Sequence, residues 1–281
     1  MKKACIFGAG QASMMAVRWL PAEYKAVCYI DNNEKKQNQK LDGLDVLSFN
    51  DALKLEPDMI WIAVLNKEAA VSIRNQIEES GFAGEILDIA DFRQYQDIRV
   101  AALRLIAQEI KERKVPGEMA ELGVFRGDFS AVMNELFPEK ELYLFDTFEG
   151  FDEKDIVIEE QFGTPGMGHR DFSNTSMELV KSKMTHPEKV HFHKGYFPET
   201  FPEGMPSLAL VSLDPDLYEP VYQGLVRFYP LLSPGGVILV HDYSSMQFPG
   251  VKKAVKRYAE EQGIFVIPLM DMHGTAVIMK P

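Results

Sequence analysis

Polar residues able to do chemistry follow short apolar runs in the second half of the chain. In order, they are Asp146, Lys194-Gly195-Tyr196, Asp214 with Asp216, and His241-Asp242. Each preceding run has the length and apolar character of a buried strand. In an open parallel sheet, ligands bind beyond the carboxyl ends of the strands. We therefore expect these side chains to converge at one edge of a single sheet.

A glycine turn, Glu121-Leu-Gly-Val-Phe-Arg-Gly127, joins the first strand of this set to a helix. Glycine lets the backbone approach a ligand closely. Asp146 ends the next strand, where a carboxylate can accept hydrogen bonds from ribose hydroxyls. NAD and S-adenosylmethionine both carry a ribose, so this pattern predicts a ribose-containing cofactor without choosing between the two.

Asp214, His241 and Asp242 follow two strands that we expect to be neighbours. Carboxylate oxygens suit Mg²⁺, and a bound cation would lower the pKa of a substrate hydroxyl. The imidazole of His241 suits softer metals better, or it acts as a general base. The catalytic candidates are Asp214 and His241, and the metal candidates are Asp214, His241 and Asp242.

We expect the elements that hold these residues to form two Rossmann-like α/β domains. Apolar strand runs alternate with helical patterns over residues 1–90, and the alternation restarts over residues 118–281. This order predicts mostly parallel sheets covered on both faces, with a closing antiparallel hairpin at the C-terminal end. The helical spacing of apolar residues over 91–117 predicts a connecting helix. Residues 149–174 are interpreted as a loop or lid.

The first domain opens with Gly8-Ala-Gly10-Gln-Ala-Ser13, which resembles a dinucleotide fingerprint with serine at the third glycine. Asp31 stands where a ribose-binding acid is expected. Gly8, Gly10 and Asp31 are therefore candidates for a nucleotide site. The domain is also similar to small Rossmann-like domains attached to sugar-modifying enzymes of bacterial glycan pathways, and this resemblance implies a nucleotide-sugar as the ligand. A structural or dimerising domain with a vestigial site is the equal alternative.

Composition excludes several classes of protein. The length of 281 residues is close to that of two average domains. The formal net charge of −12 argues against general binding to nucleic acid or to an anionic membrane. Two cysteines cannot form a disulfide framework, and no apolar run approaches the length of a membrane span. We expect a cytoplasmic protein that forms a homo-oligomer.

Six stretches in order give residues 118–280 a family resemblance. They are Glu121–Gly127, Phe145-Asp-Thr-Phe-Glu-Gly-Phe151, Thr175–Val180, Val190–Pro202, Leu213-Asp-Pro-Asp-Leu-Tyr-Glu219 and Ser233–Tyr243, with Gly250–Val255 after them. This part of the chain resembles the macrocin O-methyltransferase family, S-adenosylmethionine-dependent enzymes that methylate sugar hydroxyls. The resemblance implies a class I methyltransferase fold for the second domain.

The resemblance also implies roles for individual residues. Glu121, Gly123 and Gly127 would line the methionine part of S-adenosylmethionine, Asp146 would bind its ribose, and Lys194, Gly195 and Tyr196 would lie near its adenine. Asp214 and Asp242 would hold a divalent cation, Mg²⁺. The chain departs from the family at His241, where an acid is usual, and at Pro215, where glycine is usual.

The expected function is O-methylation of a sugar hydroxyl on a glycan, a nucleotide-sugar or a glycosylated natural product. The proton of that hydroxyl would leave to Asp214, to His241 or to a metal-bound group. Two alternatives stay open at this point. They are an NAD(P)-dependent oxidoreductase and a non-catalytic nucleotide-sugar-binding protein.

Overall fold

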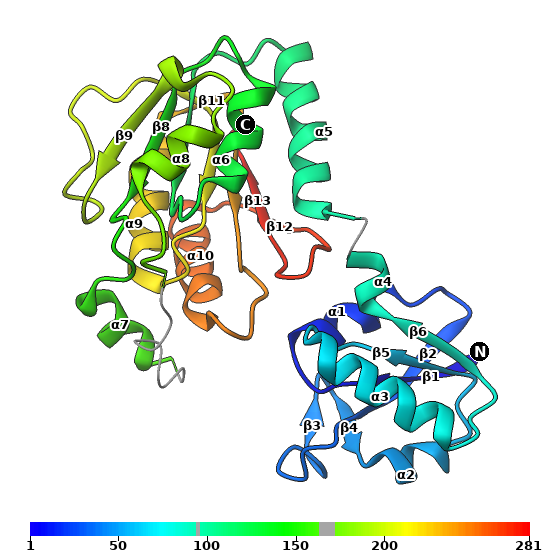
Figure 1. Cartoon of the computed structure of the whole chain (residues 1–281). Helices are drawn as coiled ribbons and strands as arrows, with labels where there is room; N and C mark the ends of the chain where they lie inside the picture. Colours follow the sequence, from blue (N-terminus) through cyan, green and yellow to red (C-terminus); the bar gives the residue numbers. More distant parts are fainter. Residues whose placement is uncertain (94–95, 163–171) are drawn as a thin grey trace. The chain divides into compact units, whose positions relative to one another are not determined.

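The computed structural model describes residues 1–93, 96–162 and 172–281 and contains two compact units (Figure 1). Unit 1 is Met1–Asp97 and unit 2 is Ile98–Pro281. Both are α/β, and the predicted fold class is confirmed. Among the described residues, no helix is long and apolar enough to cross a lipid bilayer.

Unit 1 is built on a six-stranded sheet in the order β3-β4-β2-β1-β5-β6. All neighbouring strands are parallel except β3 and β4, which form an antiparallel pair. The strands are β1 (Lys2–Phe7), β2 (Tyr24–Ile30), β3 (Lys40–Leu41), β4 (Leu44–Leu47), β5 (Met59–Ile62) and β6 (Glu85–Asp88).

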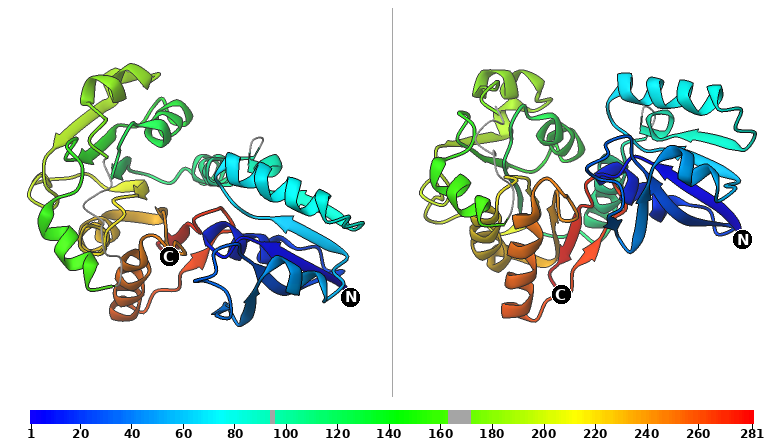
Figure 2. Two further views of the ribbon diagram at one scale, coloured as in Figure 1. Left: turned by 60° about the horizontal axis from the view of Figure 1, so that its bottom comes forward. Right: turned by 90° about the horizontal axis from the view of Figure 1, so that it is seen from below.

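The helices in the described part of unit 1 are α1 (Gln11–Trp19), α2 (Phe49–Leu53), α3 (Lys67–Glu79) and α4 (Ile89–Arg93). Helix α3, drawn in cyan, runs along the sheet (Figure 2). Its apolar residues Ala70, Ile73 and Ile77 recur at helical spacing, and they pack with Phe49 of α2 against the strands. This stripe explains why the sequence forms an amphipathic helix here.

Unit 2 contains a seven-stranded sheet in the order β12-β13-β11-β10-β7-β8-β9. The five strands from β11 to β9 are parallel, and β13 joins β11 antiparallel. The strands are β7 (Glu118–Leu122), β8 (Leu142–Asp146), β9 (Val190–Lys194), β10 (Leu208–Leu213), β11 (Leu232–Val240), β12 (Ile267–Pro268) and β13 (Ala276–Met279).

Helices cover both faces of this sheet. They are α5 (Ile98–Glu112), α6 (Asp128–Leu136), α7 (Glu153–Glu160), α8 (Met177–Lys183), α9 (Tyr218–Phe228) and α10 (Pro249–Gln262), with 3₁₀ turns at Pro187–Lys189 and Tyr229–Leu231. One apolar core joins α5, α6 and α8 to the sheet, and another joins α9 and α10 to it. Helices α9 and α10 lie side by side (Figure 2).

The structure corrects several predicted elements. Residues 149–174 are not all loop, because α7 occupies part of them; its buried residues include Asp155 and Glu159, so it has no apolar stripe to reveal it. Of this stretch, residues 163–171 lie outside the described part. The single helix predicted over 91–117 is replaced by α4 and α5. Strands β3 and β4 and helices α2 and α9 were not predicted, and Pro220 and Gly224 obscure the pattern of α9.

Candidate active site

The carboxyl ends of β7, β8 and β10 meet at the middle of the unit 2 sheet. The chain leaves β7 toward β8 on one side, whereas β10 pairs with β7 on the other. A switch of this kind leaves a crevice beyond the strand ends. Asp146 is the last residue of β8, Asp214 follows β10, and His241 follows β11.

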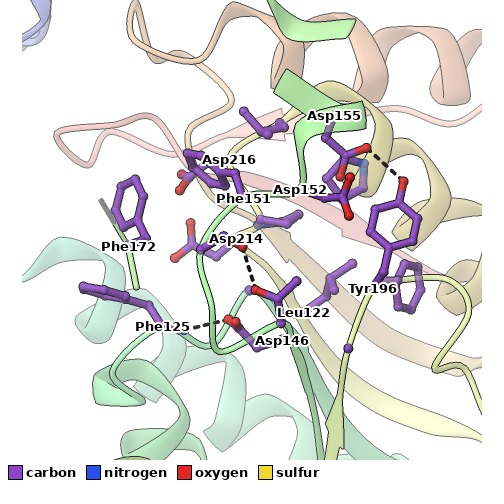
Figure 3. Close-up of a pocket in the computed structure, with 18 residues that line it drawn as sticks. Leu122, Phe125, Asp146, Phe151, Asp152, Asp155, Phe172, Tyr196, Asp214 and Asp216 are labelled. Atoms are coloured by element: carbon purple, nitrogen blue, oxygen red, sulfur yellow. Dashed lines mark hydrogen bonds between the residues drawn. The ribbon is translucent and has the colours of Figure 1, made fainter. Parts of the chain in front are cut away.

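A cavity with about 650 Å³ of empty volume lies at this edge (Figure 3). Among the described residues that line it are five aspartates and no lysine, arginine or histidine. Its lining is otherwise mostly apolar, with the rings of Phe125, Phe151 and Phe172 close together. The aspartates are Asp146, Asp152, Asp155, Asp214 and Asp216. Acidic and aromatic walls suit a cationic ligand such as a sulfonium.

Asp146 holds the turn that follows β7. Its Oδ2 accepts hydrogen bonds from the N–H groups of Val124 at 2.7 Å and Phe125 at 2.9 Å. Its Oδ1 accepts one from the N–H of Phe148 at 2.7 Å. Asp146 therefore both lines the cavity and fixes the backbone on either side of it.

Glycines let two loops approach the cavity. Gly123 has φ +82°, and a Cβ there would lie 2.3 Å from the carbonyl oxygen of Asp214. Gly195 has φ +136°, a conformation that other residues avoid. Both line the cavity. The close packing of Gly123 on the backbone after β10 explains why no side chain fits at this position.

Tyr196 lines the opposite wall and donates a hydrogen bond from its hydroxyl to Asp155 Oδ1 at 3.0 Å. Burial is the largest cause that raises the pKa of Asp155, to about 6. Lys194, which was expected beside the adenine, instead pairs with Glu149 at 2.8 Å and does not line the cavity.

Glu121 and Gly127 do not line the cavity. Glu121 is 1% exposed and accepts a hydrogen bond from Ser130 Oγ. Burial raises its pKa to about 7. Gly127 is the N-cap that precedes helix α6, and a Cβ there would lie 2.7 Å from Val180 Cγ1. The structure gives both residues roles in packing beneath the turn.

Asp214 lies between two cationic groups. Arg99 Nη1 of helix α5 donates to its Oδ2 at 2.8 Å, and His241 Nδ1 lies 2.8 Å from its Oδ1. Burial opposes the charged form, yet the charges of Arg99 and His241 hold the pKa of Asp214 below its usual value. Burial likewise opposes the imidazolium of His241, but Asp214 and Asp242 raise its pKa to about 10.

Three carboxylates gather here. One oxygen from each of Asp214, Asp216 and Asp242 lies within 4.8 Å of the others. Burial first, then the two neighbouring carboxylates, raise the pKa of Asp216 well above its usual value. Asp216 and Asp242 have positive φ angles of 63° and 57°. Non-glycine residues in this conformation are strained and concentrate at functional sites. The three carboxylates of Asp214, Asp216 and Asp242 therefore fit a divalent cation.

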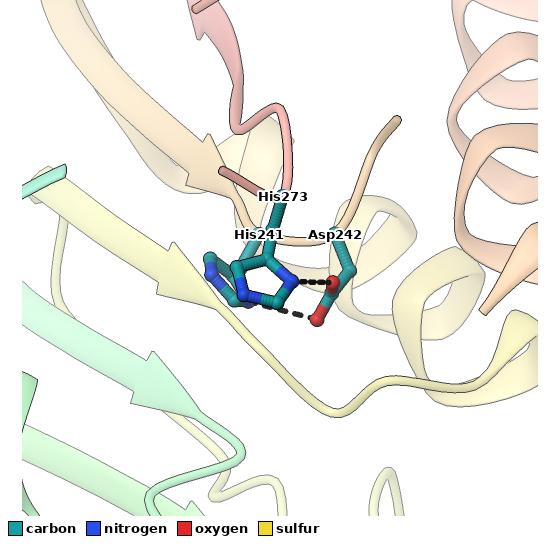
Figure 4. Close-up of side chains that lie close together, drawn as sticks. All are labelled: His241, Asp242 and His273. Atoms are coloured by element: carbon teal, nitrogen blue, oxygen red, sulfur yellow. Dashed lines mark hydrogen bonds and ion pairs between the residues drawn. The ribbon is translucent and has the colours of Figure 1, made fainter. Parts of the chain in front are cut away.

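Sequence reasoning missed three members of this region. Arg99 was assigned to a connecting helix, Asp155 to a loop, and His273 to the tip of a hairpin. His273 Nδ1 lies 3.1 Å from Asp242 Oδ1 (Figure 4). The partner of His273 is 31 residues away along the chain, so only the pairing of β11 with β13 reveals the contact.

The candidate nucleotide turn of unit 1 is closely packed. Asp31 Oδ2 accepts hydrogen bonds from the N–H of Ala9 and from Lys36 Nζ, both at 3.0 Å. A Cβ at Gly8 would lie 2.8 Å from the carbonyl oxygen of Ala63, and the N–H of Gly10 donates to Ser13 Oγ. The two glycines and Asp31 therefore meet as expected, with Lys36 as an additional cation.

Comparison with known proteins decides between the chemistries that such a cavity allows. Residues 59–280 match the family described as Macrocin-O-methyltransferase (TylF). The chain belongs to the macrocin O-methyltransferase family. Its enzymatic activity is O-methyl transfer, and the methyl donor of these enzymes is S-adenosylmethionine. Residues 1–86 also match a family described as C2185-like, N-terminal.

Relatives of this O-methyltransferase include two curated enzymes. One, from Streptomyces olivaceus, is 8-demethyl-8-(2,3-dimethoxy-alpha-L-rhamnosyl)-tetracenomycin-C 4'-O-methyltransferase. The two sequences are 27% identical in an alignment of 202 residues, and the match covers 65% of this chain and 72% of the relative. The other, from Micromonospora griseorubida, is mycinamicin III 3''-O-methyltransferase. The two sequences are 25% identical in an alignment of 234 residues, and the match covers 79% of this chain and 89% of the relative.

The fold has a counterpart among solved structures. The O-methyltransferase NovP superposes with a TM-score of 0.57 at 24% sequence identity, covering 65% of this chain and 79% of NovP. This likeness supports the class I methyltransferase fold of unit 2.

Proposed function

We propose that this O-methyltransferase methylates a sugar hydroxyl of a glycosylated small molecule or nucleotide-linked sugar. The observation that carries the proposal is the acidic and aromatic cavity at the carboxyl edge of the unit 2 sheet. The names of both curated relatives describe methylation of glycosylated compounds. The oxidoreductase and non-catalytic alternatives are less well supported, because the family is one of methyltransferases.

In this proposal the cavity walls hold the methyl donor. Asp146 would accept hydrogen bonds from the ribose, Gly123 would allow the backbone to approach, and Gly195 with Tyr196 would line the other wall. Bound S-adenosylmethionine would supply a methyl group already activated by its sulfonium. The protein then has to align the acceptor oxygen with that methyl group and exclude water.

The proton of the acceptor hydroxyl must also leave. Asp214 and Asp216 line the cavity and present carboxylate oxygens to it. A divalent cation held by Asp214, Asp216 and Asp242 would lower the pKa of the hydroxyl. His241 adjoins the same cation position, since its Nδ1 lies 2.8 Å from an oxygen of Asp214 and of Asp242.

Turnover with a panel of acceptors tests this proposal. The purified full chain, S-adenosylmethionine and Mg²⁺ or Mn²⁺ would be incubated with free rhamnosides, thymidine diphosphate-linked sugars and catechols, followed by mass spectrometry. We expect a mass gain of one methylene unit on a sugar-bearing acceptor. Methylation of catechols with no turnover on any sugar would refute the assignment of the acceptor.

For unit 1 we propose binding of a nucleotide-sugar at the turn formed by Gly8, Gly10 and Asp31. The support is Lys36 Nζ, which lies 3.0 Å from both Asp31 and the carbonyl oxygen of Ala9 and places a cation where a phosphate is expected. Calorimetric titration of thymidine diphosphate-rhamnose into wild type and Lys36→Ala tests it. Equal affinities in the two proteins would rule out this location.

A further inference from the structure

Two imidazoles and a carboxylate meet beyond the end of strand β11. His241 and Asp242 follow the strand directly, and His273 comes from the loop between β12 and β13 (Figure 4). One ligand atom from each of the three residues lies within 4.8 Å of the others. Asp242 presents Oδ2 to His241 Nδ1 at 2.8 Å and Oδ1 to His273 Nδ1 at 3.1 Å.

The backbone fixes this meeting. Strands β11 and β13 pair with Val240 opposite Ala276, so the residues just after one strand lie beside those just before the other. The N–H of Ser244 donates to the carbonyl oxygen of His273 at 3.1 Å. A Cβ at Gly274 would lie 2.4 Å from Ser244 Cβ, so glycine is needed for this approach.

A buried acid closes the turn that carries His273. Asp271 is 5% exposed and accepts hydrogen bonds from both the N–H and the hydroxyl of Thr275. Asp242 itself is 3% exposed. The carboxylate and the loop are thus set before any ion binds, which is what a metal centre requires.

The donor set differs from one that selects Mg²⁺. Magnesium prefers oxygen ligands and retains water, whereas imidazole nitrogens favour first-row transition metals. Two imidazoles beside one carboxylate are a common arrangement for such metals. Asp214 and Asp216 supply further oxygen ligands on the cavity side.

We propose that His241, Asp242 and His273, together with Asp214, form a centre that binds a divalent transition-metal ion in preference to Mg²⁺. The inference rests on the proposed function in one respect, namely that a cation at this edge of the sheet serves methyl transfer. In this arrangement His273 is a metal ligand contributed by the C-terminal hairpin. The centre lies beside the cavity wall that presents Asp214 to the acceptor.

Direct metal binding tests the proposal without any turnover. The full chain, stripped with a chelator, would be titrated with Co²⁺, Mn²⁺ and Mg²⁺ by calorimetry, and the visible absorption of bound Co²⁺ would report nitrogen ligation. We expect Co²⁺ to bind at least about 100-fold more tightly than Mg²⁺, because imidazole nitrogens suit transition metals and Mg²⁺ prefers oxygen ligands.

Variants separate the ligands from the rest of the fold. His273→Gln should weaken Co²⁺ binding by about tenfold or more and shift the Co²⁺ absorption, while Mg²⁺ affinity changes little. His241→Asp should move the preference toward Mg²⁺. His191→Gln, which removes an imidazole on strand β9 that pairs with Glu141, is the control and should bind like wild type.

Two results would overturn the proposal: tighter binding of Mg²⁺ than of Co²⁺ by wild type, or unchanged Co²⁺ affinity and absorption in folded His273→Gln. If that variant does not fold, the absorption of wild-type Co²⁺ still decides, because an all-oxygen spectrum contradicts imidazole ligation. Metal selectivity without methyl transfer to any sugar would refute the proposed acceptor and leave this inference intact.

Discussion

At the scale of single residues, position at a strand end determines most of the candidate site. Asp146, Asp214 and His241 could be identified from the sequence because each directly follows or ends an apolar strand run, and parallel strands share one carboxyl edge. Position at a strand end could not show which way the side chain of Glu121 points. Its side chain lies on a buried strand that also ends at the edge, and only packing shows that it points toward Ser130.

Glu121 gives a prediction about pH and stability. Its pKa is about 7 in the folded protein and near 4.5 when exposed, so the folded state holds more protons between these values. The free energy of unfolding of wild type should therefore fall as pH rises from 4.5 through 7. Glu121→Gln removes this loss and keeps an acceptor for Ser130.

We expect Glu121→Gln to be more stable than wild type by about 3 kcal/mol at pH 8, with the difference vanishing near pH 4. Urea denaturation at the two pH values measures both. If the variant is destabilised equally at pH 4 and pH 8, the charged form of Glu121 does not destabilise the folded protein, and the prediction is wrong.

Gly123 gives a second prediction, with a matched control. Gly123→Ala places a Cβ 2.3 Å from a backbone oxygen, whereas Gly204→Ala places one in open space at a similar φ of +74°. Left-handed strain costs about 1 kcal/mol at both positions. The clash should add about 2 kcal/mol or more at Gly123 alone. Equal loss of stability in the two variants, measured by urea denaturation, would contradict the close approach.

At the scale of elements, long-range pairing creates what the sequence could not reveal. The alternation of strands and helices predicted both sheets, because apolar period and glycine turns are local signals. Arg99 of helix α5 contacts Asp214, which is 115 residues away along the chain. His273 of the β12–β13 hairpin contacts Asp242, which is 31 residues away. Helix α7 escaped prediction because its buried positions include acids.

Helix α5 therefore serves the site as well as the core. Arg99 stacks over the Phe129 ring at 3.9 Å and pairs with Asp214, and both partners are mostly buried. Arg99→Met should cost about 3 kcal/mol of unfolding free energy, because it leaves the carboxylate without its guanidinium. Arg104→Met, at an exposed position of the same helix, is the control and should change stability little. Thermal or urea unfolding measures the loss of stability in each variant. Similar losses in the two variants would contradict the stabilising role of the Arg99–Asp214 pair.

At the scale of the whole molecule, two units with their own sheets and cores predict separable unfolding. The predicted domain boundary near residue 90 is close to the division after Asp97, whereas the family match begins at residue 59. The sequence suggested two units because strand–glycine–helix openings occur twice. It could not show how much of unit 1 belongs to the family.

Calorimetric unfolding of the full chain should show two transitions. S-adenosylhomocysteine should raise the midpoint temperature of one of them. A ligand that binds only folded unit 2 stabilises that unit by about 2.7 kcal/mol at 100 times its dissociation constant. A single transition that shifts as a whole with ligand would instead mean that the two units unfold together.

The central claim is that the cavity at the carboxyl edge of unit 2 binds the methyl donor. Calorimetric titration of S-adenosylhomocysteine into the full chain, with and without a divalent cation, tests it most directly. We predict micromolar affinity for wild type and for Asp128→Ala, whose carboxylate is exposed on helix α6. Asp146→Ala, confirmed as folded by circular dichroism, should bind at least about tenfold more weakly. No binding by wild type, or equal binding by Asp146→Ala, would contradict the account.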